Sequence, residues 1–108
     1  MRRRPAAAVF ALSLLMALAS STALAQAPAR PAKLGQCMAC HGEFGHARVP
    51  GVPHLAGQDA QYLSSALLAY RGGQRRHPLM NSIANTLQPR DIQSLALWFA
   101  SQPPGRVR

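Results

Sequence analysis

With 108 residues, the chain is long enough for one small domain and too short for two. It is strongly basic, because twelve Lys and Arg stand against three Asp and Glu, a formal net charge of +9 at pH 7. Two cysteines three positions apart exclude a disulfide scaffold. Since a core of this size supplies only about 3 to 5 kcal/mol, we expect a tightly bound group to stabilise the fold.

Residues 1–25 have the layout of a secretory signal peptide. Three arginines are followed by an apolar run, residues 6–19, and then by Ala23-Leu24-Ala25, a small-x-small cleavage site. We therefore predict cleavage after Ala25 and a periplasmic location. The alternative is an uncleaved anchor, because residues 6–25 come close to the roughly 20 apolar residues of a membrane helix. Serine and threonine within the run argue against the anchor.

Cleavage after Ala25 leaves 83 residues, and the mature chain is still basic. Nine Lys and Arg remain against three acidic residues, a formal charge of +6. Nucleic acid is the usual partner of such a chain, but export argues against it, as does the scattering of the basic residues over loops and helix ends. We therefore expect no nucleic acid partner.

The first half of the mature chain is predicted to be mostly irregular. Residues 26–31 are rich in proline and alanine and are expected to be a disordered lead-in. From residue 32 a helix of about two turns is expected to run into the cysteines, since Pro31 limits its length. Glycines and prolines in residues 41–58 predict a loop.

The second half is predicted to be mainly helical. Residues 59–71 form the clearest helix, which ends at the cap signal Gly72-Gly73 and has an apolar face: Tyr62, Leu63, Ala66, Leu67 and Tyr70. Residues 74–87 are expected to be mostly irregular, with one turn near Ile83. A last helix begins at Pro89, places apolar residues on one face and ends before Pro103.

No segment shows the alternation typical of a strand, so the fold class is predicted to be all-α. The domain is expected to span residues 32–102, and residues 103–108 to form a flexible tail.

The reactive side chains concentrate in GQCMACHGEFG, residues 35–45, where Cys37 and Cys40 are followed at once by His41. Cysteines this close serve redox disulfides, zinc sites or covalent haem attachment. A redox pair follows a strand in a βαβ unit, and no such unit is visible. A zinc site needs a second ligand pair, which the remaining histidines do not form: His46, His54 and His77.

The order Cys-x-x-Cys-His is typical of c-type haem attachment, and its chance appearance in so short a chain is below about one in a thousand. On one helical turn, Cys37 and Cys40 can reach the two vinyl groups of a haem, and His41 can lie beneath the iron. Both thiols are then used in thioethers, which suits an oxidising compartment.

These residues resemble the class I c-type cytochromes, and more closely the small bacterial periplasmic monohaem proteins, which are similar to one half of the dihaem periplasmic cytochromes. The likeness covers nearly all of the mature chain and rests on five segments: CMACHG (37–42), PHLAGQ (53–58), YL (62–63), YRGGQRRHPLM (70–80) and LWFASQ (97–102). It implies a cytochrome c fold, in which three to four short helices surround one covalently bound haem.

The resemblance also implies crossing terminal helices, with Trp98 near their contact. Here the chain departs from the pattern, because Ala29 and Lys33 stand where many members have glycine and an aromatic residue. We therefore expect a first helix that is shorter or packs differently. Gln88 is a second departure, since Ser, Thr or Asp would cap the last helix more strongly.

By this resemblance, the iron ligands are His41 and Met80. The carbonyl of Pro53 is expected to accept a hydrogen bond from His41, and Leu55 to pack on the haem ring. Two further cofactor-binding residues are Tyr62, as a wall of the pocket, and Arg75, as a partner of a haem propionate.

The sixth ligand separates a carrier from an enzyme. Met38 is held between the two attachment cysteines, and on the family likeness His46 and His54 belong to the proximal loop, so that Met80 and His77 remain. A methionine ligand raises the potential and suits a carrier. His77 or an open site is the alternative.

The sequence therefore predicts a periplasmic one-electron carrier with a single haem c, attached through Cys37 and Cys40, and not an enzyme. Its partners are expected to be redox proteins with an acidic docking patch, with no small-molecule substrate, and the protein to be a monomer or a subunit of a redox complex. The alternatives are a cytochrome subunit of a larger dehydrogenase and, less favoured, a peroxidase-like haem enzyme with a labile sixth ligand.

Overall fold

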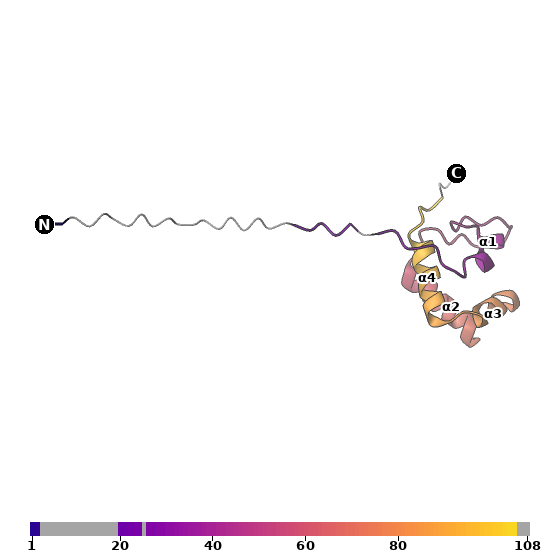
Figure 1. Ribbon diagram of the computed structural model, residues 1–108. Coiled ribbons are helices and arrows are strands. Elements are labelled where there is room, and N and C mark those ends of the chain that lie inside the picture. The colour runs from indigo at the N-terminus through magenta and orange to yellow at the C-terminus, as the bar shows by residue number, and fades with distance from the viewer. Residues whose placement is uncertain (3–19, 25, 106–108) are drawn as a thin grey trace.

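The structure is a computed structural model that describes residues 1–2, 20–24 and 26–105. Most of the predicted leader and residues 106–108 lie outside this description, so cleavage after Ala25 and the domain boundaries stay predictions. The described residues form four helices and no strand: α1 (Gly35–His41), α2 (Ala60–Gly72), α3 (Pro78–Asn85) and α4 (Pro89–Ala100). The predicted all-α fold class is confirmed (Figure 1). No helix in these described ranges has the length and hydropathy needed to cross a membrane.

Helix α2 packs against both α3 and α4. In the view of Figure 1, α1 and α3 lie on the same side of the pair formed by α2 and α4. Thr86 Oγ1, just after α3, lies 2.9 Å from Gln36 Oε1 in α1 and 2.7 Å from the carbonyl of Ile83, so its single proton is shared between the two helices. The two segments that carry the predicted iron ligands are therefore joined directly.

The ends of α2 and α4 follow from their sequences. Asp59 caps α2, because its Oδ2 accepts a hydrogen bond of 2.8 Å from the backbone N–H of Tyr62. Gly73 ends α2 in the left-handed conformation, with φ 79°. At the start of α4, Asp91 Oδ2 accepts a hydrogen bond of 2.9 Å from the backbone N–H of Gln88. Asp91 therefore stabilises the start of this helix, where Gln88 itself is a weak cap.

Helix α3 corrects the expectation of an irregular segment with a single turn near Ile83. It extends over eight residues and begins with Pro78 at its first position. His77 acts as the N-cap, because its Nδ1 accepts a hydrogen bond of 3.3 Å from the backbone N–H of Met80. Histidine is not among the usual capping residues, so the sequence did not indicate that a helix begins after His77.

The core lies between α2, α4 and the segments that flank the helices. Its buried side chains form one cluster: Leu34, Leu63, Leu87, Ile92, Leu95, Ala96 and Phe99. Helix α1 has seven residues, none of them fully buried; Cys37 and Met38 pack against the core, and Leu34 just before the helix is buried in it. The expectation of a short first helix is thus confirmed.

Trp98 connects α4 to the chain just beyond α1. Its Nε1 donates a hydrogen bond of 2.8 Å to the carbonyl of Glu43, and its ring stacks on Phe44 with 6.1 Å between centroids. The side chain of Glu43 forms an ion pair with Arg30. The C-terminal helix therefore positions the segment after His41 through Trp98.

Candidate functional site

Helix α1 holds Cys37, Cys40 and His41 within seven residues. Both cysteine side chains are half-buried. Burial raises the pKa of the Cys37 thiol from its ordinary 9.0 to about 11. Reactive cysteines in redox Cys-x-x-Cys motifs have a lowered pKa instead, so the environment of Cys37 argues against a redox disulfide.

The imidazole of His41 is oriented by a backbone carbonyl. His41 Nδ1 lies 2.9 Å from the carbonyl oxygen of Pro53. Since a carbonyl only accepts, Nδ1 carries the proton and Nε2 keeps its lone pair. A histidine that binds a metal through one nitrogen commonly donates the other N–H to such a partner. The contact expected between His41 and Pro53 is present, and Nε2 is available to iron.

A closed loop brings Pro53 back to His41. The carbonyl of Gly45 accepts hydrogen bonds from the backbone N–H groups of Leu55, at 2.8 Å, and Ala56, at 3.1 Å. Gly45 has φ 82°, and a Cβ added there would lie 2.5 Å from the backbone nitrogen of Ala56. The loop therefore needs glycine at residue 45, both for the backbone conformation and for the close approach.

The other predicted pocket residues lie around this loop and on α2. Leu55 is half-buried and packs against the core cluster. Tyr62 is in the first turn of α2, and 53% of it is exposed. Contact of either side chain with a haem stays a prediction.

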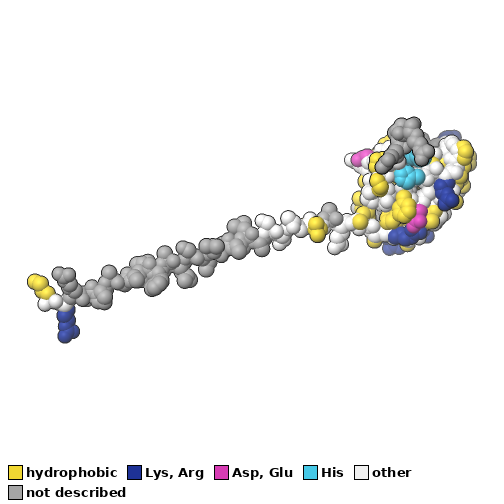
Figure 2. All heavy atoms as spheres, turned by 90° about the horizontal axis from the view of Figure 1, so that it is seen from above, with side chains coloured by type: hydrophobic (Ala, Val, Ile, Leu, Met, Phe, Trp, Pro, Cys, Tyr) yellow, Lys and Arg dark blue, Asp and Glu magenta, His cyan; other side chains and the backbone are white. Residues whose placement is uncertain are grey.

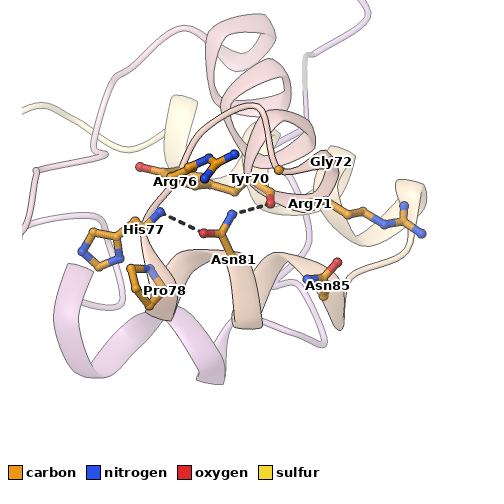
Figure 3. Close-up of a pocket in the computed structure, with 9 residues that line it drawn as sticks. Tyr70, Arg71, Gly72, Arg76, His77, Pro78, Asn81 and Asn85 are labelled. Carbon is orange, nitrogen blue, oxygen red and sulfur yellow. Dashed lines mark hydrogen bonds between the residues drawn. The ribbon is translucent and has the colours of Figure 1, made fainter.

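Met80 lies in the first turn of α3 and is half-buried. The next residue, Asn81, is hydrogen-bonded to three points on the backbone, and Figure 3 shows its bonds to Tyr70 and His77. Its Nδ2 donates to the carbonyls of Tyr70, at 2.7 Å, and Arg75, at 2.8 Å, while its Oδ1 accepts from the backbone N–H of His77, at 2.8 Å. Asn81 thus fixes the start of α3 to the end of α2.

Sequence reasoning missed Asn81. The position of Asn81 in the sequence could have indicated its role. It directly follows the candidate ligand and lies near the start of a helix, where the asparagine side chain tends to bond to the backbone. Its long-range partners depend on how the loop between α2 and α3 folds, which no local pattern reveals.

Arg75 lies over an aromatic ring. Its Cζ is 4.6 Å from the ring centroid of Tyr70, a cation–π contact. The pairing of Arg75 with a haem propionate stays a prediction.

The three other histidines lie on the surface, as expected, and His54 Nδ1 accepts a hydrogen bond of 2.8 Å from the backbone of Ala47. In the part of the chain that the structure describes, no three His, Cys, Asp or Glu side chains come together as a metal site.

The residues present fit a covalently attached haem. Two thiols one helical turn apart can form two thioethers, and the adjacent imidazole has a free Nε2 because Pro53 holds its Nδ1. The thioether of Met80 lies on α3, which is connected to α1 through the hydroxyl of Thr86 and the side chain of Gln36. The chemistry of this donor set, sulfur and imidazole, suits haem iron.

No model of a protein family matches the chain. It is 44% identical over 73 residues to cytochrome c-554(548) of Halomonas halodenitrificans, and the matched residues cover 65% of this chain and 88% of that protein. It is 41% identical over 69 residues to the thiosulfate dehydrogenase electron acceptor of Stutzerimonas stutzeri, over 61% of this chain and 32% of that protein. The solved cytochrome c4 of Acidithiobacillus ferrooxidans is similar with a TM-score of 0.57 and 34% identity, over 60% of this chain and 37% of that one.

Proposed function

This chain belongs to the class I c-type cytochromes, which are electron carriers, and we propose that it is a periplasmic carrier with one haem c attached through Cys37 and Cys40. The observation that carries this proposal is the 2.9 Å contact between His41 Nδ1 and the Pro53 carbonyl, directly after the two thiols. It leaves Nε2 of His41 as the proximal ligand. Met80 is the sixth ligand, and the protein catalyses no bond making.

The haem, when bound, supplies an iron that alternates between the ferrous and ferric states. The chain's own residues keep the ligands in place in both states. Pro53 fixes the tautomer and orientation of His41, and the hydrogen bonds of Asn81 fix the first turn of α3, which carries Met80. A methionine ligand stabilises ferrous iron relative to a second imidazole, and this raises the potential.

A single haem is supported by the chain's one Cys-x-x-Cys-His motif. The chain spans 88% of cytochrome c-554(548) but only about a third of the two longer relatives. One of these is named as the electron acceptor of thiosulfate dehydrogenase. We therefore infer that the electron donor is a dehydrogenase, with the chain as its free acceptor or as its cytochrome subunit.

Periplasmic location is supported by the signal-peptide layout of residues 1–25 and by the cysteine pair, which thioether formation protects from oxidation. N-terminal sequencing of the exported protein should give Gln26 as the first residue. A protein that still begins at Met1 and stays with membranes would indicate the anchor instead.

The function is tested on the mature protein produced together with cytochrome maturation machinery. We expect a mass increase of one haem per chain and an optical spectrum that changes reversibly on reduction. The variant Cys37→Ala/Cys40→Ala is the control and should contain no covalent haem. A wild-type protein without haem contradicts the whole proposal. Rapid peroxide turnover by the wild type would favour the enzyme alternative.

The partner should carry an acidic docking patch, because the mature chain has nine Lys and Arg against three acidic residues. Opposite charges steer association, and salt screens them. Electron transfer to the physiological partner should therefore slow as ionic strength rises. A rate that is unchanged or rises contradicts a basic docking face.

A further inference from the structure

We propose that the corner between α2 and α3 is a docking site for carboxylate side chains of an acidic redox partner, an inference that rests on the carrier function proposed above. A hollow of about 550 Å³ lies there, between the last turn of α2, residues 72–77 and one face of α3 (Figure 3). Two arginines line it, Arg71 from the end of α2 and Arg76 from the connecting loop. Both are exposed.

The positive charge of this corner is not compensated by the chain's acidic residues. Glu43 forms an ion pair with Arg30, while Asp59 and Asp91 cap helices α2 and α4. None of the three lines the hollow, and among the described residues no ion pair involves Arg71 or Arg76. No Asp or Glu side chain of this chain therefore neutralises these guanidinium groups, which leaves them open to carboxylates of a second protein.

The backbone around the hollow is held by internal hydrogen bonds. Asn81 binds the carbonyls of Tyr70 and Arg75, and the backbone N–H of Arg75 donates to the carbonyl of Ala69 at 3.1 Å. The loop that carries Arg76 is thus tied to both helices. A surface that is already ordered loses less conformational entropy when a partner binds.

The hollow lies on the opposite face of α3 from Met80. Pro78, Asn81 and Asn85 line the hollow and share one face of α3, since they are three and four residues apart. Met80 is two residues after Pro78, roughly 200° around the helix. A protein docked at the corner is therefore separated from the predicted iron ligand Met80 by the thickness of α3.

The chemistry of the corner selects carboxylates on a protein surface. Guanidinium groups bind carboxylates in a planar, bidentate geometry. The hollow is shallow, because most of its lining residues are exposed, among them Gly72, Gly73 and His77. A shallow basic hollow suits the side chains of a second protein better than an enclosed small molecule.

The test uses the holoprotein and a hexaglutamate peptide as the acidic probe, followed by chemical shifts of the backbone amides. We expect shifts concentrated at residues 71–77 and at Asn85. Arg71→Gln/Arg76→Gln should weaken binding of the peptide about three- to tenfold. Arg48→Gln/Arg90→Gln removes the same charge at two exposed positions outside the hollow, and it should weaken binding by less than about twofold.

Equal weakening by both double variants would show a response to net charge alone and would overturn the docking site. Binding of inorganic phosphate at the same amides, without binding of hexaglutamate, would overturn it in favour of a small-anion site. Arg71→Lys/Arg76→Lys should bind the peptide between wild type and the glutamine variant, because the charge stays and the bidentate geometry is lost.

Haem content and reversible reduction are measured on the same samples. If the haem is absent, the carrier function fails; if the haem is present and the arginines have no specific effect, only the docking site fails.

Discussion

His41 Nδ1 and the carbonyl oxygen of Pro53 lie 2.9 Å apart, although twelve residues separate them in the sequence. The glycine- and proline-rich segment between them closes on itself at Gly45, whose carbonyl binds the backbone of Leu55 and Ala56. The chain is thereby turned back, and the carbonyl of Pro53 faces helix α1, which the chain leaves at His41. The partner that orients the His41 imidazole is thus a backbone carbonyl, so its role must be tested through the glycine that closes the loop.

Gly45→Ala should destabilise the holoprotein by about 2 to 5 kcal/mol, because the left-handed backbone and the overpacked Cβ both cost free energy. The Cβ would meet backbone atoms of Ala56, which cannot move aside as a side chain could. Gly51→Ala is the matched control: Gly51 also has a positive φ, 80°, but nothing lies within 4 Å of its Cβ position. It should cost only about 1 to 2 kcal/mol.

Guanidinium denaturation followed by the absorbance of the haem measures both glycine variants. Equal losses of stability at Gly45 and Gly51 would mean that the close approach to Ala56 contributes nothing. The position of His41 would then have to be explained by Pro53 itself.

The sequence predicted the helices whose signals are local. Helix α2 has both an apolar face and the Gly72-Gly73 stop, and α4 begins at Pro89, so α2 and α4 were both expected. Helix α3 was missed because its cap is the imidazole of His77, and its first turn is also held from α2 through Asn81. Tertiary hydrogen bonds of this kind leave no periodic pattern.

The order Cys-x-x-Cys-His predicts Cys37 and Cys40 as the attachment residues, and the contact of the Pro53 carbonyl with His41 followed from the resemblance to the family. The place of Trp98 was only partly predictable. The ring was expected near a crossing of terminal helices, but α1 is short, and Trp98 instead contacts the segment beyond it. The segment that contacts the half-buried Trp98 ring depends on the length of α1, which local propensities fix poorly.

Trp98→Phe removes the indole N–H that binds the carbonyl of Glu43 and keeps an aromatic ring near Phe44. We expect a loss of about 1 kcal/mol in the free energy of unfolding, the net value of one hydrogen bond. Circular dichroism is the measurement, since Trp98 is the chain's single tryptophan and its fluorescence is lost with it. Leu97→Ala, at an exposed neighbour, should change stability by less than about 0.5 kcal/mol. A Trp98→Phe variant as stable as wild type would show that the bond to Glu43 does not hold this segment.

Asn81→Ala should loosen the first turn of α3, because the carbonyls of Tyr70 and Arg75 lose the bonds that the Asn81 amide donates and the N–H of His77 loses its acceptor. The expected cost is about 1 to 3 kcal/mol. Imidazole should also displace the thioether of Met80 at lower concentrations than in wild type, as seen by optical titration. Asn85→Ala, one turn later on the exposed side of α3, should leave the free energy of unfolding and the imidazole concentration needed for displacement unchanged. If the two variants respond alike to imidazole, Asn81 stabilises the fold without positioning the ligand.

Met80→Ala tests the sixth ligand. The wild-type ferric protein should show the weak far-red charge-transfer band of methionine sulfur on iron, and the variant should lack it. Its potential should fall, since ferrous iron loses the thioether that stabilises it, and external ligands should bind the open site. Leu79→Ala is the control, because Leu79 is the preceding residue and 54% exposed, and it should keep the band. A band that is absent from the wild type, or that survives Met80→Ala, would exclude Met80. The variant His77→Ala then distinguishes the remaining possibilities: if it changes the ferric spectrum, His77 is the ligand, and if it does not, the sixth site is open.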